Sequence, residues 1–180
     1  GRTDIPQPGA YVHFHWTGMA MPMPYLSVPG YLLQLTAFNR FCSGDLPARG
    51  GFYNRATGRG FDGLIYMNGE ESGSEGRAFG HVVTGDGKGT SYELPYLGKF
   101  SWENSVAHPD AGDKTIVVGL DDSTPGQVYV YVGNKQAYGS PVERAGLQYG
   151  KLYGVKITNG GTNYANGSAP LKTSSSRLTI

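Results

Sequence analysis

Two pairs of acidic residues stand between apolar runs of this chain. Asp121 and Asp122 interrupt "TIVVGLDDSTPGQVYVYVG", and Glu70 and Glu71 interrupt "GLIYMNGEESGSEGRAF". Carboxylate oxygens are the ligands of hard cations, and Ca²⁺ takes six to eight oxygens, more than one turn supplies. Acid pairs that converge from different parts of the fold would therefore form a metal site. The alternative is that both pairs are solvated turn acids that bond their own backbone.

A fifth acid extends this set. Glu103 follows Trp102 at the end of an apolar run in "LGKFSWENSV", where it either begins a loop or joins the other acids. The predicted metal ligands are therefore Glu70, Glu71, Glu103, Asp121 and Asp122. Arg77, directly after Gly76, is predicted either to contact a substrate phosphate or to pair with Glu70 or Glu71.

Other reactive side chains carry weaker patterns. Cys42 is the single cysteine, which excludes a disulfide within the chain and a multi-cysteine zinc site, so we expect a small buried residue. His13 and His15 lie on one face of an expected strand, where surface or packing roles are favoured over metal binding. The chain has no G-x-S-x-G and no H-E-x-x-H motif, so serine hydrolase and zincin chemistry lack their main support.

Composition favours strands and turns. The 180 residues include 29 glycines and 11 prolines, with a formal net charge of +1. This predicts one all-β domain over 1–180, and no nucleic acid or membrane partner. No apolar run reaches the roughly 20 residues of a spanning helix, and Gly1 and Arg2 do not open a signal segment.

The expected order along the chain is an irregular lead-in over 1–40, rich in proline and methionine, followed by strands over 41–180. Residues 32–41 suit either a helix or a buried strand. The strands are expected at 63–68, 78–84, 91–94, 99–103, 115–120, 127–133 and 152–158, with turn sequences between them.

A repeat underlies the strand pattern. Glu70 aligns with Asp121 and Gly76 with Gly126, which gives a period of 51 or 50 residues (121 − 70 = 51, 126 − 76 = 50). A period near 50 with several strands per unit is typical of β-propeller blades. The expected fold is therefore a β-propeller of antiparallel blades, or the N-terminal part of one belonging to a longer chain.

Five stretches carry a family resemblance: "RFCSGDLPA", "GEESGSEGRAFGHV", "LGKFSWEN", "TIVVGLDDSTPGQVYVYVGNK" and "VERAGLQYGKLYGVKI". In content and order they resemble the PhoX-type alkaline phosphatases and their bacterial relatives. The resemblance covers 40–157. It implies an exported six-bladed propeller that hydrolyses phosphate monoesters with calcium and iron at its axis, and it maps the family's metal ligands onto the same five acids.

Two departures from the family stand in the sequence. Gly69 takes the place of a cysteine that ligates iron before the Glu-Glu pair, and we expect Cys42, which belongs to another motif, not to replace it. The family's later Arg-Pro-Glu segment has no counterpart before Ile180.

The predicted function is a metal-dependent phosphoesterase acting on a small phosphorylated substrate in the periplasm or outside the cell, with calcium and iron as cofactors. The alternative is a non-catalytic, secreted calcium-binding propeller or an extracellular structural subunit, with self-assembly or a missing C-terminal portion. Carbohydrate binding through exposed tyrosine and tryptophan side chains suits the composition but has no motif behind it.

Overall fold

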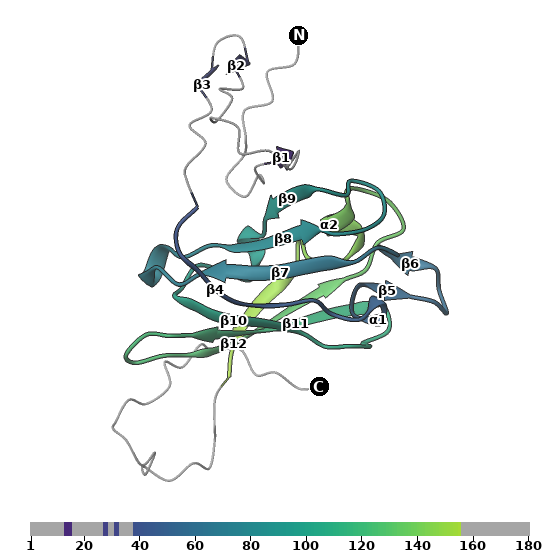
Figure 1. Ribbon diagram of the computed structural model, residues 1–180. Helices are drawn as coiled ribbons and strands as arrows, with labels where there is room; N and C mark the ends of the chain where they lie inside the picture. Colours follow the sequence, from purple (N-terminus) through teal and green to yellow (C-terminus); the bar gives the residue numbers. More distant parts are fainter. Residues whose placement is uncertain (1–12, 16–26, 29–30, 33–37, 156–180) are drawn as a thin grey trace.

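The protein is mostly β-structure, arranged in antiparallel sheets (Figure 1). The computed structural model describes residues 38–155 in full, together with the backbone of the short strands β1 (His13–His15), β2 (Ser27–Val28) and β3 (Tyr31–Leu32). The predicted lead-in over 1–40 and the last residues of the chain lie largely outside this description. Within the described residues, two large sheets form and no closed propeller.

The first sheet contains an antiparallel meander whose first strand, β4, lies at one edge of the sheet. Its strands lie in the order β1-β9-β8-β7-β4, and all neighbours are antiparallel. Four of them follow one another in the chain: β4 (Phe41–Asp45), β7 (Ile65–Glu70), β8 (Ala78–Val82) and β9 (Thr90–Glu93). The connection from β4 to β7 contains α1 (Arg49–Phe52) and the hairpin of β5 (Tyr53–Asn54) and β6 (Arg59–Gly60).

The second sheet repeats this meander with four strands. They are β10 (Trp102–Ala107), β11 (Lys114–Asp121), β12 (Val128–Asn134) and β13 (Lys151–Gly154), paired antiparallel in that order. Valine, isoleucine and tyrosine fill β11 and β12, as expected for residues that fit a pleated surface. The helix α2 (Pro141–Arg144) stands between β12 and β13, and its Ser140 and Glu143 form a capping box.

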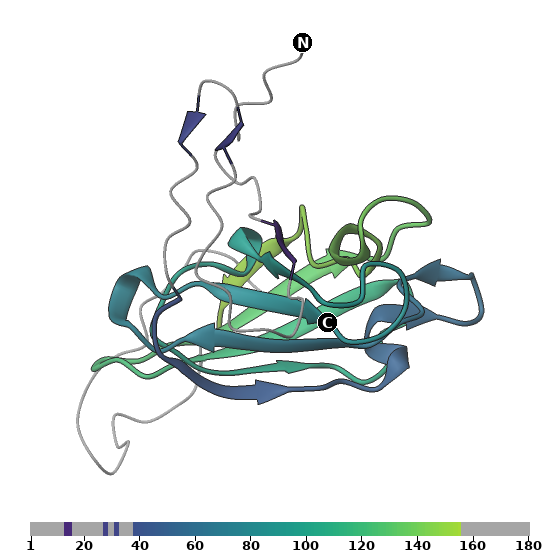
Figure 2. The same ribbon diagram turned by 45° about the horizontal axis from the view of Figure 1, so that its top comes forward.

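The core lies between the two sheets, which are stacked with β4 and β7 next to β10 (Figures 1 and 2). Ile65 and Met67 come from the first sheet, and Val117 and Tyr131 from the second; all four are at most 1% exposed. Trp102 is also buried, and its ring stacks on Phe100 at 4.0 Å between centroids. Burial of these side chains is the main force that holds the sheets together.

The repeat predicted from the sequence has a counterpart in backbone hydrogen bonds. Glu70 N donates to Arg77 O (2.9 Å), and at the aligned position Asp121 N donates to Gln127 O (3.1 Å). One residue on, Glu71 N donates to Arg40 O (2.9 Å), as Asp122 N does to Ser101 O (2.8 Å). Each acid pair therefore ends the second strand of its four-stranded meander and is tied to the residue before the first strand of the same meander.

Most predicted strands are present with shifted bounds, and one shift bears on the site. The strand expected at 99–103 is β10, which begins at Trp102, because Pro95–Leu97 forms a 3₁₀ turn and Gly98 adopts a positive φ of 87°. Glu103 therefore lies near the start of a strand and not at its end. The segment 32–41 was expected to form a helix or a buried strand. The strands Tyr31–Leu32 and Phe41–Asp45 reach its two ends, and residues 33–37 lie outside the described residues.

Candidate metal centre

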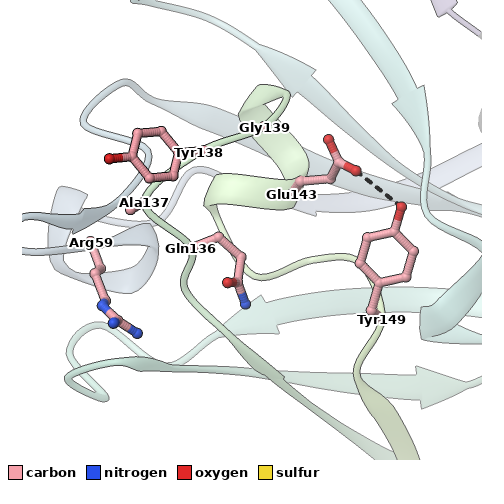
Figure 3. Close-up of a pocket in the computed structure, with 7 residues that line it drawn as sticks. All are labelled: Arg59, Gln136, Ala137, Tyr138, Gly139, Glu143 and Tyr149. Atoms are coloured by element: carbon pink, nitrogen blue, oxygen red, sulfur yellow. Dashed lines mark hydrogen bonds between the residues drawn. The ribbon is translucent and has the colours of Figure 1, made fainter.

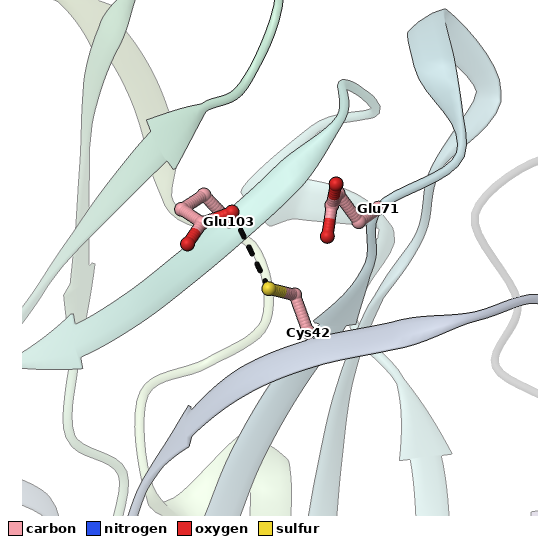
Figure 4. Close-up of side chains that lie close together, drawn as sticks. All are labelled: Cys42, Glu71 and Glu103. Carbon is pink, nitrogen blue, oxygen red and sulfur yellow. Dashed lines mark hydrogen bonds between the residues drawn. The ribbon is translucent and has the colours of Figure 1, made fainter.

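Three side chains that can ligate a metal meet where the two sheets adjoin. Cys42 comes from β4, Glu71 from the residue after β7, and Glu103 from β10 (Figure 4). One ligand atom from each, the thiol sulfur and two carboxylate oxygens, lies within 4.8 Å of the other two. Within the part of the chain that the structure describes, this is the only such group of three or more His, Cys, Asp or Glu side chains.

Irregular strand pairing positions two of the three. The register between β4 and β7 shifts between Phe41 and Gly44, and that between β10 and β11 shifts between Trp102 and Asn104. Cys42 and Glu103 stand within these shifts. Bulges of this kind re-aim a side chain that regular alternation would direct elsewhere. Both side chains are half-buried.

Hydrogen bonds favour the protonated, neutral form of the Cys42 thiol. Sγ of Cys42 donates to Oε2 of Glu103 at 3.3 Å. Hydrogen bonds to the carboxylates of Glu71 and Glu103, together with burial, raise the pKa of the Cys42 thiol above its ordinary value. Metal binding needs the thiolate, so an ion at this site would displace a proton, and its affinity would rise with pH.

The donor set discriminates among metals. One sulfur and two carboxylates suit iron or zinc, which accept thiolate together with oxygen ligands. Calcium prefers oxygen ligands alone and more of them. Cys42, Glu71 and Glu103 therefore fit the iron that the family resemblance implies better than its calcium.

Two of the predicted functional residues, Glu70 and Arg77, engage each other. Arg77 donates from Nε to Oε2 of Glu70 (2.8 Å) and from Nη2 to Oε1 (2.7 Å), and the Glu70 side chain is 2% exposed. Burial raises the pKa of the Glu70 carboxyl, but the hydrogen bonds from Arg77 and from the Asn39 backbone outweigh it and hold the pKa below its ordinary value. Of the two roles predicted for Arg77, the structure shows the ion pair with Glu70. Glu70 therefore lies outside the group of three.

The aspartate pair also lies outside that group. The Asp121 carboxylate accepts a hydrogen bond from the Ser123 hydroxyl two residues on (2.6 Å), and Asp122 is exposed. This bond is local to the turn, although it joins two side chains and not a side chain to the backbone. Of the five predicted ligands, the structure therefore brings together Glu71 and Glu103.

Cys42 is the ligand candidate that sequence reasoning missed. It was expected to be a small buried residue, but it is half-buried and faces two acids. Gly69, where the family resemblance implies a cysteine, cannot carry a side chain without a shift, because a Cβ there would lie 2.4 Å from Cβ and Cγ of Trp102. The repeat of 50 or 51 residues could not have found it, because Cys42 and Glu103 are 61 residues apart. Their equivalence comes from the strand register, in which Trp102 pairs with Asp121 as Phe41 pairs with Glu70.

A second hollow, of about 590 Å³, lies beside α2 (Figure 3). Tyr138 and Tyr149 flank it and are 88% and 66% exposed. The Tyr149 hydroxyl donates to Oε1 of Glu143 (3.0 Å), whose other oxygen accepts from Ser140 in the capping box. Its remaining lining residues are Arg59, Gln136, Ala137 and Gly139. The hollow presents aromatic faces, as a sugar-binding site would, and no cluster of metal ligands.

Comparison of the chain with protein-family models, with curated proteins and with solved structures finds no match. No helix in the described residues has the length and apolar character needed to cross a membrane.

Proposed function

We propose that this protein is a metal-dependent phosphoesterase in which Cys42, Glu71 and Glu103 bind the ion. The convergence of these three side chains from separate strands carries the proposal. The resemblance to PhoX-type phosphatases adds the substrate class, a phosphate monoester. A bound ion at such a site acts as a Lewis acid on a phosphoryl oxygen and lowers the pKa of bound water.

Arg40 is the residue we propose to contact the substrate phosphate. Its guanidinium pairs with Glu71, and its side chain is 69% exposed, so it stands at the solvent side of the metal ligands. Guanidinium groups bind phosphate oxygens in two parallel hydrogen bonds. Arg77, the sequence-based candidate for this role, is only 16% exposed and is held by Glu70.

We propose that the protein folds as a β-propeller and that the two described sheets are successive blades of it. Each is an antiparallel meander of four consecutive strands, and the first strands of both, β4 and β10, lie side by side. In a propeller the first strands line the axis, and residues there converge from several blades. The thiol and carboxylates would then stand at the axis, facing solvent in the channel.

Metal analysis combined with a phosphatase assay tests the function. We expect the protein, incubated with iron or zinc and then desalted, to retain about one ion per chain and to hydrolyse p-nitrophenyl phosphate. Cys42→Ser and Glu103→Gln should lose the ion and the hydrolysis, whereas Arg40→Gln should keep the ion and raise KM. Glu75→Gln is the matched control, because Glu75 is an exposed acid outside the group of three, and it should keep both.

The possible results separate the two function classes. An ion retained without hydrolysis favours the non-catalytic alternative, a secreted structural protein that binds metal for stability. Absence of a retained ion, or retention that survives Cys42→Ser, contradicts the proposed site. Loss of the ion in Asp122→Asn as well would show that Asp122 also binds it, as the sequence predicts.

A further inference from the structure

The second sheet is apolar on both of its faces. One face packs into the core through Val117 and Tyr131. The other, which we call the front face, is formed by alternate residues of β11 and β12: Ile116, Val118, Leu120, Val128, Val130 and Val132. Strands that are apolar on both sides are typical of sheets covered on both sides. Leu120 and Val128, which pair across the two strands, are nevertheless 37% and 36% exposed.

The first sheet shows what covers such a face. With the repeat of 51 and 50 residues, the front-face residues correspond to Ile65, Met67, Gly69, Ala78, Gly80 and Val82. Those positions are buried, and they lie against the second sheet. A Cβ on Gly69, for example, would touch Trp102 of β10 at 2.4 Å. The front face of one sheet is therefore built to receive the opposite face of the next.

The first sheet has a back face equivalent to the back face of the second sheet, which is the surface that covers the front face of the first sheet. The second sheet contacts the first through its back face, which includes Val117, Tyr129 and Tyr131. The corresponding residues of the first sheet are Tyr66, Phe79 and His81. They lie on that sheet's own back face with Phe38 and Phe41. Tyr66 and His81 line a hollow of about 440 Å³ there with these two rings, and Phe79 is buried against them. Phe38 is 41% exposed there.

We propose that the front face of the second sheet binds the back face of the first sheet of another copy of this chain. The contact continues, between molecules, the sheet-on-sheet contact that exists within each molecule. Both surfaces are on the chain, so no other partner is required. The two surfaces differ, which makes the contact head-to-tail, and such contacts generate rings when the rotation closes and open chains when it does not. Leu120 and Val128 form an exposed apolar patch on the front face, and exposed apolar patches mark interaction sites.

The docking would add a residue to the metal centre. Within one chain, Glu71 of the first sheet meets Glu103 of the second. Asp122 of the second sheet is equivalent to Glu71 of the first, and Cys42 is equivalent to Glu103. Docking would therefore put Asp122 of one copy beside Cys42 of the other. The inference does not depend on the proposed function, because it rests on the apolar faces and the repeat.

Two blocked variants test the proposal in metal-free buffer by sedimentation velocity over a range of concentrations. Leu120→Asp with Val128→Asp blocks the front face, and Phe38→Asp blocks the back face. We expect the unmodified protein to associate, each blocked variant to stay monomeric, and an equimolar mixture of the two to form a 1:1 dimer through the one intact pair of faces. Tyr138→Asp, at a site 88% exposed beside α2 and outside both faces, should associate like the unmodified protein.

Other outcomes overturn the proposal. If the unmodified protein is monomeric at its highest soluble concentration, the front face does not bind a second copy. If Phe38→Asp alone still forms dimers, the contact is front to front. Circular dichroism of each variant establishes that it is folded. Should Phe38→Asp unfold, His81→Glu replaces it as the back-face block, and the same mixing result is required.

Discussion

Cys42 and Glu103 hold the same place in the two sheets, and their side chains meet, with Sγ 3.3 Å from Oε2. Each is the second residue of the first strand of its four-stranded meander, and each stands where the strand pairing is irregular. Because β4 and β10 lie side by side, the repeat brings two equivalent positions together. The candidate site is therefore a property of neighbouring repeat units and not of one turn.

The reactivity of the thiol checks this geometry. The carboxylates of Glu71 and Glu103 raise the pKa of Cys42 by accepting from the protonated thiol. In metal-free protein, Glu71→Gln and Glu103→Gln should each move the midpoint of the pH dependence of alkylation to a lower pH. The rate with iodoacetamide, followed by mass spectrometry, reports one site, because the chain has one cysteine. Glu75→Gln, an exposed acid elsewhere, is the control, and an unchanged midpoint in both test variants would contradict the contacts.

Strands and their repeat were predictable from the sequence because both leave periodic marks. Alternating apolar residues located β7, β8, β11 and β12 to within a few residues. The alignment of Glu70 with Asp121 anticipated the matching hydrogen bonds at the ends of the second strands. These features depend on local sequence, which is what pattern reasoning measures.

The site was less predictable because it depends on contacts between distant residues. Cys42 is 61 residues from Glu103, and no local pattern tells which acid a lone cysteine will face. The pairing of Glu70 with Arg77 was one of two alternatives open from the sequence, and burial of Glu70 decided between them. Bulges also disrupt the alternation from which the direction of a side chain is read.

The Glu70 and Arg77 pair should contribute strongly to stability. Arg77→Met leaves a buried carboxylate without its main partner, and breaking a buried pair in this way costs about 3–5 kcal/mol of unfolding free energy. The pKa of Glu70 is held below its ordinary value, so the contribution is present above the unfolded pKa, near 4.5, and is lost as pH falls through the folded pKa. Urea unfolding at neutral pH and at pH 3 measures both effects.

A surface pair provides the matched control for that variant. Lys99 and Glu75 lie 3.0 Å apart with side chains 52% and 78% exposed. Exposed pairs contribute about 0–1 kcal/mol, so Lys99→Met should cost far less than Arg77→Met. Equal losses in the two variants would show that the Glu70 pair is not buried in solution.

His81 should make stability depend on pH between neutral and mildly acidic conditions. Its ring is hydrogen-bonded to Ser91 Oγ (2.7 Å) and Asn68 Oδ1 (2.9 Å), and burial lowers its pKa below the ordinary value of 6.5. The unfolded chain therefore binds the proton more readily. The free energy of unfolding should be highest above pH 6.5 and fall with pH down to the folded pKa, by at most about 1.4 kcal/mol per pH unit.

The variant His81→Gln tests that assignment. It should flatten the dependence between pH 5 and 7 in urea unfolding, whatever it does to the overall stability. His108→Gln changes an exposed histidine and should leave the slope as it is. A slope that persists in His81→Gln would assign the dependence to another group.

Gly69 should be intolerant of any side chain, although it lies in an ordinary strand. A Cβ there would stand 2.4 Å from two atoms of Trp102, whose side chain is 1% exposed and has no room to move. Gly69→Ala should therefore destabilise the protein by about 1–3 kcal/mol, the usual cost of overpacking a core. Gly80→Ala is the control, because its Cβ would meet the methyl ends of Ile65 and Leu94 at 3.2 and 3.4 Å. Thermal unfolding of both variants measures the difference, and Gly69→Cys should lose at least as much stability as Gly69→Ala without gaining a second metal-binding sulfur. If Gly69→Ala were no less stable than Gly80→Ala, the close packing of β7 on β10 would be wrong, and with it the reason that the sulfur of this site comes from Cys42.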